Sequence, residues 1–278
     1  MLKQRVFTAL VLLLVFLPTL FSTAVWPFQV LSALLVTAAA WEWAKLNGCG
    51  RAAAIAWAAW FVCWVIALGF STLPPALWLV AGFAWLLLGP LLLRAGVLAW
   101  PGYPRWLRLL LGQLALVLAW LALVQARTWG SYFLLSILVL VWVADSAAYF
   151  AGRAWGGRIF SRKLAALISP RKSWEGVLGA FVGVVALAFL WRWLDVQLHV
   201  AAPSWFTHMA QSGWLWMVLA ALLLASMGVV GDLLQSLVKR SAGVKDSSTL
   251  LPGHGGVLDR IDALLPVLPL AMMLVSWR

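Results

Sequence analysis

Residues 213–231, GWLWMVLAALLLASMGVVG, decide the fold, because this stretch contains no charged side chain. A helix needs about 20 apolar residues to cross the hydrocarbon core of a bilayer. Comparable apolar runs recur along the chain, and the short segments between them carry almost all of the charge. We therefore expect an all-α, polytopic integral membrane protein.

The composition agrees with this expectation, since 65% of the 278 residues are hydrophobic and only 10% are charged. Ordinary soluble domains are about a quarter charged. The prolines at 27, 266 and 269 leave room for a re-entrant pair or a kinked last run, so eight or ten spans also fit. Our prediction is about nine transmembrane helices, near residues 6–26, 27–44, 52–72, 75–93, 107–126, 130–150, 176–194, 213–231 and 261–277.

These runs leave no space for a separate soluble domain. We expect a single integral membrane domain over residues 1–278, in which residues 1–144 form N-terminal transmembrane helices. Residues 145–278 form the catalytic half, with cytoplasmic loops at 151–175 and 232–260. Six of the eight acidic residues lie in or beside these two loops, which places the expected active site there.

The distribution of basic residues predicts the orientation. With the N-terminus in the cytoplasm, all of the 20 Lys and Arg residues except Arg127, Arg192 and Arg278 fall in inside loops. This is the positive-inside pattern of membrane proteins. The net charge of +12 is thereby explained by anionic lipid, and it implies no nucleic-acid partner.

Several common kinds of site are absent from the sequence. Cys49 and Cys63 have no paired spacing that would suggest a zinc site or a disulfide framework. There is also no Walker A pattern, no pair of metal-binding histidines and no nucleophile elbow. The chemistry must therefore come from the acidic and basic residues of the two loops.

The segment after residue 231 has the pattern of a helix with one polar and one apolar face. Asp232, Ser236, Lys239 and Arg240 would share one polar stripe, because their spacings of four, seven and eight residues fall on one helical face. A carboxylate, a hydroxyl and two cations suit Mg²⁺ and the phosphates that it bridges. The alternative is an interfacial helix whose polar face is simply solvated.

The next segment, residues 245–262, favours the functional interpretation. Glycines around His254 allow the backbone to approach a ligand closely, and residues 247–249 offer hydroxyl donors. Asp259 and Asp262 are three residues apart and would share a helical face, so a metal ion or Arg260 must relieve their repulsion. We favour a metal over a structural ion pair, and we do not expect His254 to be a metal ligand.

Two upstream features complete the predicted site. Asp145 lies inside the sixth apolar run, and an ionisable residue within a membrane span is by default functional. Ser169 followed by Pro170 is typical of a helix start. Arg171 and Lys172 would hold phosphate, with Glu175 orienting them.

These motifs resemble a known family. Ser236-Leu-Val-Lys-Arg, Lys245-Asp246 and Leu251-Pro-Gly-His-Gly-Gly-Val-Leu-Asp-Arg-Ile-Asp262 are similar in sequence and spacing to the C-terminal signature of the CDP-diacylglycerol synthases, or phosphatidate cytidylyltransferases. Residues 145–152 and 169–176 resemble two further segments of that family. The resemblance implies CTP and phosphatidic acid as substrates, CDP-diacylglycerol and pyrophosphate as products, and a requirement for Mg²⁺, with K⁺ as an option for a second ion.

The resemblance also implies roles for individual residues. Metal binding falls on Asp232 and Asp259. We expect catalytic roles for Asp232, Asp246, Asp259, Lys239 and Arg240. We expect substrate or phosphate binding by Lys172, Ser236, Lys245, His254, Arg260, Asp145 and Asp262.

The expected location is the bacterial cytoplasmic membrane, with the active site facing the cytoplasm. Membrane lipids surround the protein there, and the sequence leaves a homodimer open. Two other functions stay in view. One is a CTP-dependent lipid kinase, which would release CDP rather than pyrophosphate, and the other is an anion or lipid transporter, in which Asp145 and a basic vestibule would conduct rather than catalyse.

Overall fold

All elements of the described chain are helices, apart from one isolated β-bridge between Leu251 and Gly255. The computed structural model describes residues 2–69, 73–200 and 202–276, so the prediction for Arg278 lies outside the described residues. A membrane-embedded backbone must satisfy its own hydrogen bonds, which favours helices throughout. The helices are α1 (Leu2–Phe21), α2 (Trp26–Leu46), α3 (Arg51–Leu68), α4 (Pro75–Ala95), η1 (Trp100–Gly102), α5 (Arg105–Trp129), α6 (Ser131–Trp155), α7 (Trp174–Gln197), α8 (Trp205–Ala210), α9 (Trp214–Ser241), α10 (Leu258–Ile261) and α11 (Leu264–Ser276).

Within the described ranges, six helices are long and apolar enough to cross a membrane, namely α3, α4, α5, α6, α7 and α9. The structure thus supports a helical membrane protein but not the predicted count of nine spans. The clearest difference is the last run, where α11 has 13 residues. At 1.5 Å per residue it covers about 20 Å, which is short of the roughly 30 Å hydrocarbon core.

Helix α11 is instead the central packing element of the bundle. Almost all of its side chains are buried, and it contacts α4, α5 and α9. Two glycines permit this close packing: a Cβ on Gly82 of α4 would lie 2.3 Å from Met273 Sδ, and a Cβ on Gly231 of α9 would lie 2.5 Å from the Asp262 carbonyl oxygen. The second contact brings Asp232 close to the start of α11.

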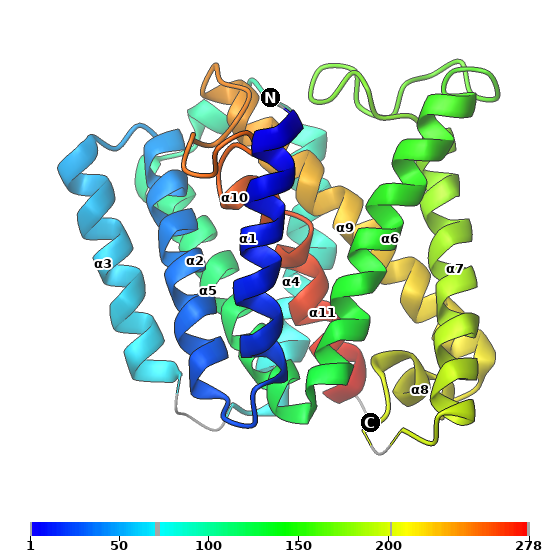
Figure 1. Cartoon of the computed structure of the whole chain (residues 1–278). Coiled ribbons are helices and arrows are strands. Elements are labelled where there is room, and N and C mark those ends of the chain that lie inside the picture. Colours follow the sequence, from blue (N-terminus) through cyan, green and yellow to red (C-terminus); the bar gives the residue numbers. More distant parts are fainter. Residues whose placement is uncertain (1, 70–72, 201, 277–278) are drawn as a thin grey trace.

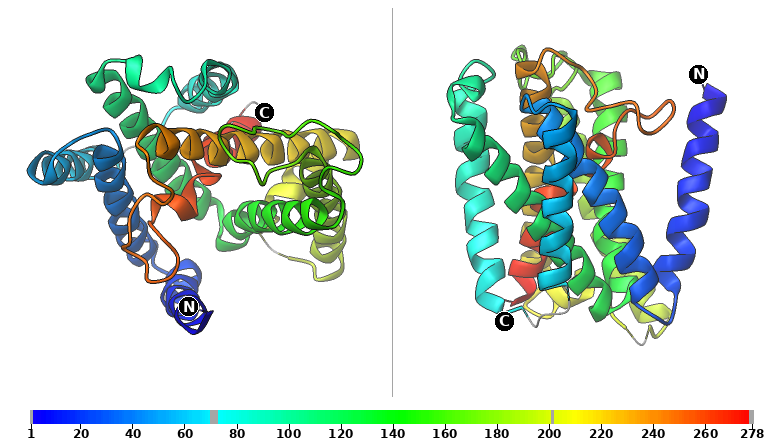
Figure 2. Two further views of the ribbon diagram at one scale, coloured as in Figure 1. Left: turned by 90° about the horizontal axis from the view of Figure 1, so that it is seen from above. Right: turned by 90° about the vertical axis from the view of Figure 1, so that its left-hand side faces the viewer.

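Figure 1 shows the long loop between α6 and α7 and the loop between α9 and α10 at the same end of the bundle, with α8 at the opposite end. Helix α9 runs obliquely across the bundle in Figure 1 and in the view from above in Figure 2. It contacts α7 and α8 as well as α4 and α11. Its C-terminal part therefore joins the two loops predicted to form the site.

Helix α7 begins later than the sequence predicted. Ser173 is its N-cap, and the Ser173 hydroxyl accepts a hydrogen bond from the Gly176 backbone N–H at 3.2 Å. The prediction of a start at Ser169-Pro170 was wrong, because the serine four residues downstream supplies the capping oxygen. Residues 156–173 consequently form a loop at the end of the bundle that also holds the α9–α10 loop.

Candidate active site

The predicted helix over residues 231–240 is confirmed as the last part of α9, which continues without interruption to Ser241. Asp232, Ser236 and Lys239 lie on one face, as their spacing requires. Within this stripe the Ser236 hydroxyl contacts Asp232 Oδ1 at 3.4 Å, a long hydrogen bond. Asp232 therefore keeps one oxygen that is only weakly engaged by the protein.

The other oxygen of Asp232 is held by the α6–α7 loop. Lys172 Nζ lies 2.6 Å from Asp232 Oδ2, and the side chains of Lys172 and Asp232 are 24% and 35% exposed. The structure thus brings together two residues that the sequence placed in different motifs. Because both are partly open to solvent, the pair is accessible to a ligand.

Glu175 does not orient the neighbouring basic residues, contrary to the sequence-based prediction. Its Oε1 accepts hydrogen bonds from the backbone N–H groups of Gly157, Ile159 and Phe160 at 3.0–3.1 Å. The carboxylate is buried at the first turn of α7 and folds the α6–α7 loop back onto the helix. Glu175 therefore fixes the conformation of the loop that carries Lys172 and does not pair with the lysine side chain.

A second ion pair lies further along α9. Lys239 Nζ is 2.6 Å from Asp259 Oδ1, and the Asp259 side chain is only 6% exposed. Its other oxygen accepts hydrogen bonds from the Ser247 N–H, the Ser247 hydroxyl and the Gly256 N–H at 2.8–3.0 Å. Asp259 is thus the point at which the α9–α10 loop is tied to α9.

These contacts set the ionisation of Asp259. Burial alone would raise the pKa of its carboxyl group, but the hydrogen bonds from Lys239 and from the Gly256 and Ser247 backbone outweigh burial and hold the pKa below its ordinary value. Asp259 is therefore an anion at neutral pH. A buried anion of this kind is stable only while its cationic partner and its donors stay in place.

Asp262 lies near both ion pairs, since the charges of Asp232, Lys172 and Lys239 all act on it. The three-residue spacing of Asp259 and Asp262 had predicted that they share a helical face. Helix α10 ends at Ile261, and Asp262 Oδ1 instead accepts a hydrogen bond from the next N–H, that of Ala263, at 2.8 Å. The cation paired with Asp259 is Lys239, whereas the structural alternative to a metal in the sequence was Arg260.

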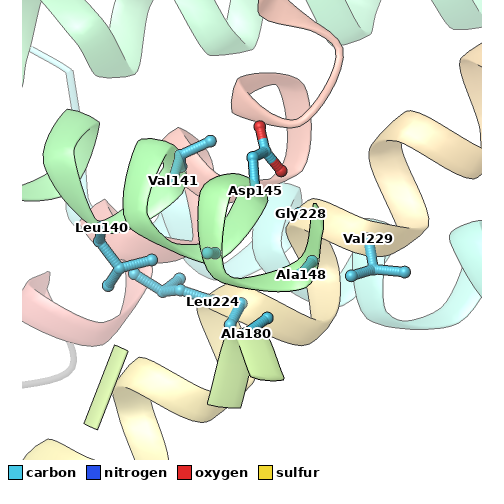
Figure 3. Close-up of a pocket in the computed structure, with 10 residues that line it drawn as sticks. Leu140, Val141, Asp145, Ala148, Ala180, Leu224, Gly228 and Val229 are labelled. Atoms are coloured by element: carbon cyan, nitrogen blue, oxygen red, sulfur yellow. The ribbon is translucent and has the colours of Figure 1, made fainter. Parts of the chain in front are cut away.

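Asp145 belongs to the same electrostatic cluster, because the charges of Asp232 and Lys172 act on it. It lies at the edge of an apolar pocket between α6, α7 and α9. In Figure 3 its carboxyl group points away from the apolar side chains of Leu140, Leu224 and Ala180. Asp145 therefore marks the boundary between this small apolar pocket and the polar cluster around Asp232.

Arg240 and Arg260 both donate hydrogen bonds to backbone carbonyl groups of the loops. Arg240 donates to the carbonyl oxygens of Ile168 and Val244 at 3.4 and 3.2 Å. Arg260 donates to the carbonyl oxygen of His254 through Nε and Nη2 at 3.2 and 2.6 Å. Arg240 thus connects the α6–α7 loop to the α9–α10 loop, and Arg260 holds the α9–α10 loop alone.

Lys245, Asp246 and His254 complete the predicted set. Lys245 and Asp246 are exposed, and His254 is half-buried. The Asp246 side chain lies against Gly255, where a Cβ would be 3.5 Å from Asp246 Cβ and 3.0 Å from Asp259 Oδ2. Asp246 therefore stands on the outer side of the same turn whose inner side faces Asp259.

Sequence reasoning missed Glu42, which is fully buried in α2. Its carboxylate accepts hydrogen bonds from the hydroxyls of Ser247 and Ser248 and from the backbone N–H groups of Val257 and Leu258. One signal could have revealed it: Glu42 is the only acidic residue before position 145, and it lies in an apolar run. By the rule applied to Asp145, it warranted a functional hypothesis.

Across the described residues, no group of three or more His, Cys, Asp or Glu side chains is close enough to hold a metal ion. Mg²⁺ does not require such a group, since it commonly binds one or two carboxylates and completes its shell with water and substrate phosphates. Asp232 and Asp259 each accept a lysine ammonium at 2.6 Å, so both attract cations. Asp232 suits a metal better, because it is more exposed and one of its oxygens is only weakly bonded.

Comparison with known proteins agrees with this chemistry. The model of the cytidylyltransferase family matches residues 3–277. A Pseudomonas aeruginosa protein named phosphatidate cytidylyltransferase is 39% identical over 278 residues, which cover 97% of this chain and 95% of that protein.

Shorter matches point the same way. Proteins of the same name from Haemophilus influenzae and Thermotoga maritima are 44% and 42% identical over 140 and 146 residues. These matches span 50% and 52% of this chain and 44% and 49% of the two relatives.

Proposed function

The chain belongs to the cytidylyltransferase family, and we propose on this premise that it transfers CMP from CTP to phosphatidic acid, forming CDP-diacylglycerol and pyrophosphate. The observation that carries the proposal is the match over nearly the whole length of a relative named for this activity. The ion-paired cluster around Asp232 and Asp259 supports it, because it gathers opposite charges from both signature loops.

The reaction needs little acid–base chemistry. A phosphate oxygen of phosphatidic acid attacks the α-phosphorus of CTP in line, the new P–O bond forms, and the bond to the β-phosphate oxygen breaks to release pyrophosphate. The second pKa of a phosphomonoester is about 6, so the nucleophile is already an anion at neutral pH. No side chain has to remove a proton from it.

The main obstacle is repulsion between two polyanions. Cationic side chains around Asp232 and Asp259 lower this repulsion and stabilise the charge that develops on the leaving pyrophosphate. Lys172 and Lys239 are the innermost of these, and each would exchange its aspartate partner for a phosphate oxygen. The outer cations are Arg240, Lys245 and Arg260.

Asp232 and Asp259 are the residues that would hold Mg²⁺ in this proposal, with Ser236 beside them and K⁺ as an option for a second ion. A metal held there would neutralise part of the negative charge of the phosphates. Asp145 and Asp262 would line the polar side of the cavity, and His254 and Asp246 its outer loop. The ion pairs of Asp232 with Lys172 and of Asp259 with Lys239 support this assignment, since they show that both carboxylates bind cationic groups.

The proposal also fixes an orientation. CTP is a water-soluble nucleotide, whereas the acyl chains of phosphatidic acid stay in the bilayer, so the site must be open to both. The end of the bundle that carries the α6–α7 and α9–α10 loops would face the cytoplasm of a bacterial inner membrane, as the positive-inside pattern predicts. The apolar pocket below Asp145 would lie on the lipid side.

Product identification tests the function. Purified protein is incubated with CTP, phosphatidic acid and Mg²⁺, and the products are identified by mass spectrometry. We expect CDP-diacylglycerol and pyrophosphate in equal amounts. Release of CDP together with a phosphorylated lipid would indicate a kinase, and passage of anion or lipid across vesicles without consumption of CTP would indicate a transporter.

A further inference from the structure

Glu42 connects the N-terminal helices to the loop that forms the site. Its two oxygens accept four hydrogen bonds, from the Ser247 and Ser248 hydroxyls and from the N–H groups of Val257 and Leu258. These donors come from both ends of the α9–α10 loop, more than 200 residues away in sequence. One carboxylate therefore closes this loop and attaches it to α2.

The hydroxyl of Ser247 lies between two carboxylates. It is 2.9 Å from Glu42 Oε2 and 2.9 Å from Asp259 Oδ2. A hydroxyl has one proton, so it donates to only one of them at a time. The Ser247 backbone N–H donates to Asp259 at 2.8 Å as well, which makes this residue the direct link between Glu42 and the ion pair of Asp259 with Lys239.

Gly256 shows how closely the loop fits around Glu42. A Cβ at this position would lie 1.9 Å from Ser247 Oγ, 2.5 Å from Glu42 Oε1 and 2.6 Å from Glu42 Oε2. Its backbone N–H donates to Asp259 Oδ2 at 3.0 Å. The glycine is therefore required at the point where the loop backbone passes between Glu42 and Asp259.

Helix α2 provides a rigid base for this carboxylate. The residue after Glu42, Trp43, donates its indole N–H to the Arg108 carbonyl oxygen at 3.0 Å and packs against Gly112 of α5. The next turn is fixed by Asn47, whose side-chain amide donates to the Trp43 carbonyl oxygen at 2.9 Å. Glu42 thus holds the loop from a part of α2 that is attached to α5.

We propose that Glu42 is a positioning residue for catalysis: through Ser247 and the backbone at 256–258 it holds Asp259, and with it Lys239, in the geometry that the reaction needs. The inference rests on the proposed cytidylyl transfer. Glu42 does not touch the substrates in this proposal, so its effect reaches the reaction through Asp259. Small displacements of a reacting group of about 1 Å cost on the order of 100-fold in rate.

The test uses the isosteric substitution Glu42→Gln in the full-length protein. The glutamine amide keeps one accepting oxygen, but its NH₂ group cannot accept a hydrogen bond, so the two loop donors that faced the replaced oxygen lose their acceptor. We expect kcat for CDP-diacylglycerol formation to fall by about 100-fold, with a much smaller change in the KM for CTP. Glu42→Asp, which keeps the charge, should recover part of the loss.

A matched control exists at the other end of the bundle. Asp195 is also a buried carboxylate, and it accepts hydrogen bonds from the Ser204 N–H, the Ser204 hydroxyl and the Thr207 hydroxyl. Figure 1 places the α7–α8 connection opposite to the two loops. Asp195→Asn should therefore lower the Tm while leaving kcat per folded molecule within about twofold of wild type.

A double-mutant cycle with Ser247→Ala separates positioning from a merely structural role. The double variant carries both Glu42→Gln and Ser247→Ala. If Glu42 acts through Ser247, the double variant's fold-loss of kcat will be clearly smaller than the product of the fold-losses of the two single variants. Two results would overturn the inference but leave the proposed function standing. One is a double variant whose loss equals the product of the two single losses. The other is a normal kcat in Glu42→Gln while the wild type forms CDP-diacylglycerol. A wild type that forms no CDP-diacylglycerol would overturn the proposed function, and the inference with it.

If Glu42→Gln does not fold, Glu42→Asp and Ser247→Ala carry the test. Both must then lower kcat more than they lower the folded fraction measured by size-exclusion chromatography. Activity that follows the folded fraction in both variants would contradict the inference.

Discussion

Lys172 Nζ lies 2.6 Å from Asp232 Oδ2, so a single ion pair joins the loop between α6 and α7 to the polar face of α9. The two partners are 60 residues apart in the chain. In the proposed reaction Asp232 would be one of the residues that hold Mg²⁺, and Lys172 would neutralise phosphate charge, so this pair would open when the nucleotide binds. The Asp232 carboxylate and the Lys172 ammonium thus stabilise the fold in the free protein and would bind ligands in the complex.

Replacing Asp232 tests this assignment. Asp232→Asn should lower kcat/KM for CDP-diacylglycerol formation by at least about 100-fold, because a preorganised charge at the reacting phosphates is lost. Ser226→Ala is a suitable control, since Ser226 lies on the same helix and its hydroxyl donates to the Leu222 carbonyl oxygen. Near-normal turnover in both Asp232→Asn and Asp259→Asn would refute the metal assignment.

Removal of divalent cations gives a second prediction. Dialysis against EDTA should abolish CDP-diacylglycerol formation, and added Mg²⁺ should restore it, since the two substrates repel each other without a bridging ion. Asp232→Asn should need a higher Mg²⁺ concentration for half-maximal activity than the wild type. Full activity after complete chelation would contradict a catalytic role for the metal.

The ionisation of Asp259 predicts a pH dependence of stability. Its folded pKa is lowered, so its stabilising contribution is complete above the unfolded value of about 3.9 and is lost as the pH falls from there through the folded pKa. The Tm difference between wild type and Asp259→Asn should be constant from pH 6 to 8 and shrink below about pH 4. A difference that changes across neutral pH would show that another group controls it.

Gly256 should not tolerate even one methyl group. Gly256→Ala places a Cβ 1.9 Å from Ser247 Oγ and 2.5 Å from Glu42 Oε1, so the loop must move away from Asp259. We expect loss of activity and faster proteolysis of the α9–α10 loop. Gly102→Ala, where nothing lies within 4 Å of the added Cβ, should behave like the wild type in both assays.

The orientation can be checked by cysteine labelling. Cys49 and Cys63 are replaced, and single cysteines are introduced at the exposed positions Arg162 and Gln211. An impermeant maleimide added to intact cells should label Gln211→Cys but not Arg162→Cys, because the α6–α7 loop is proposed to be cytoplasmic. The opposite pattern of labelling would reverse the topology.

Much of the site was predictable from the sequence because its residues repeat at helical spacings. Asp232, Ser236 and Lys239 lie on one face of a continuous helix, as their spacing of four and seven residues required. Their partners were not predictable from spacing. Lys172 and Asp259 reach α9 from separate loops, so these contacts depend on how the helices pack.

The predictions that failed had physical reasons. Hydropathy cannot distinguish a helix buried in protein from one buried in lipid, and α11, a buried helix of 13 residues, is not among the six candidate spans of the described residues. The contact of Glu175 was also predicted wrongly, and Glu42 was overlooked. Glu175 and Glu42 both bind backbone N–H groups of loops, and such contacts leave no periodic pattern in the sequence.

The cluster around Asp232 and Asp259 is proposed to transfer the CMP group of CTP to a lipid phosphate. The most direct measurement follows radioactivity from CTP labelled with ³²P at either the α- or the γ-phosphate into the lipid fraction, with purified protein, phosphatidic acid and Mg²⁺. We expect lipid labelling from the α-phosphate alone, and loss of that labelling in Asp232→Asn. Labelling from the γ-phosphate, or equal α-labelling in Asp232→Asn, would contradict the proposed transfer.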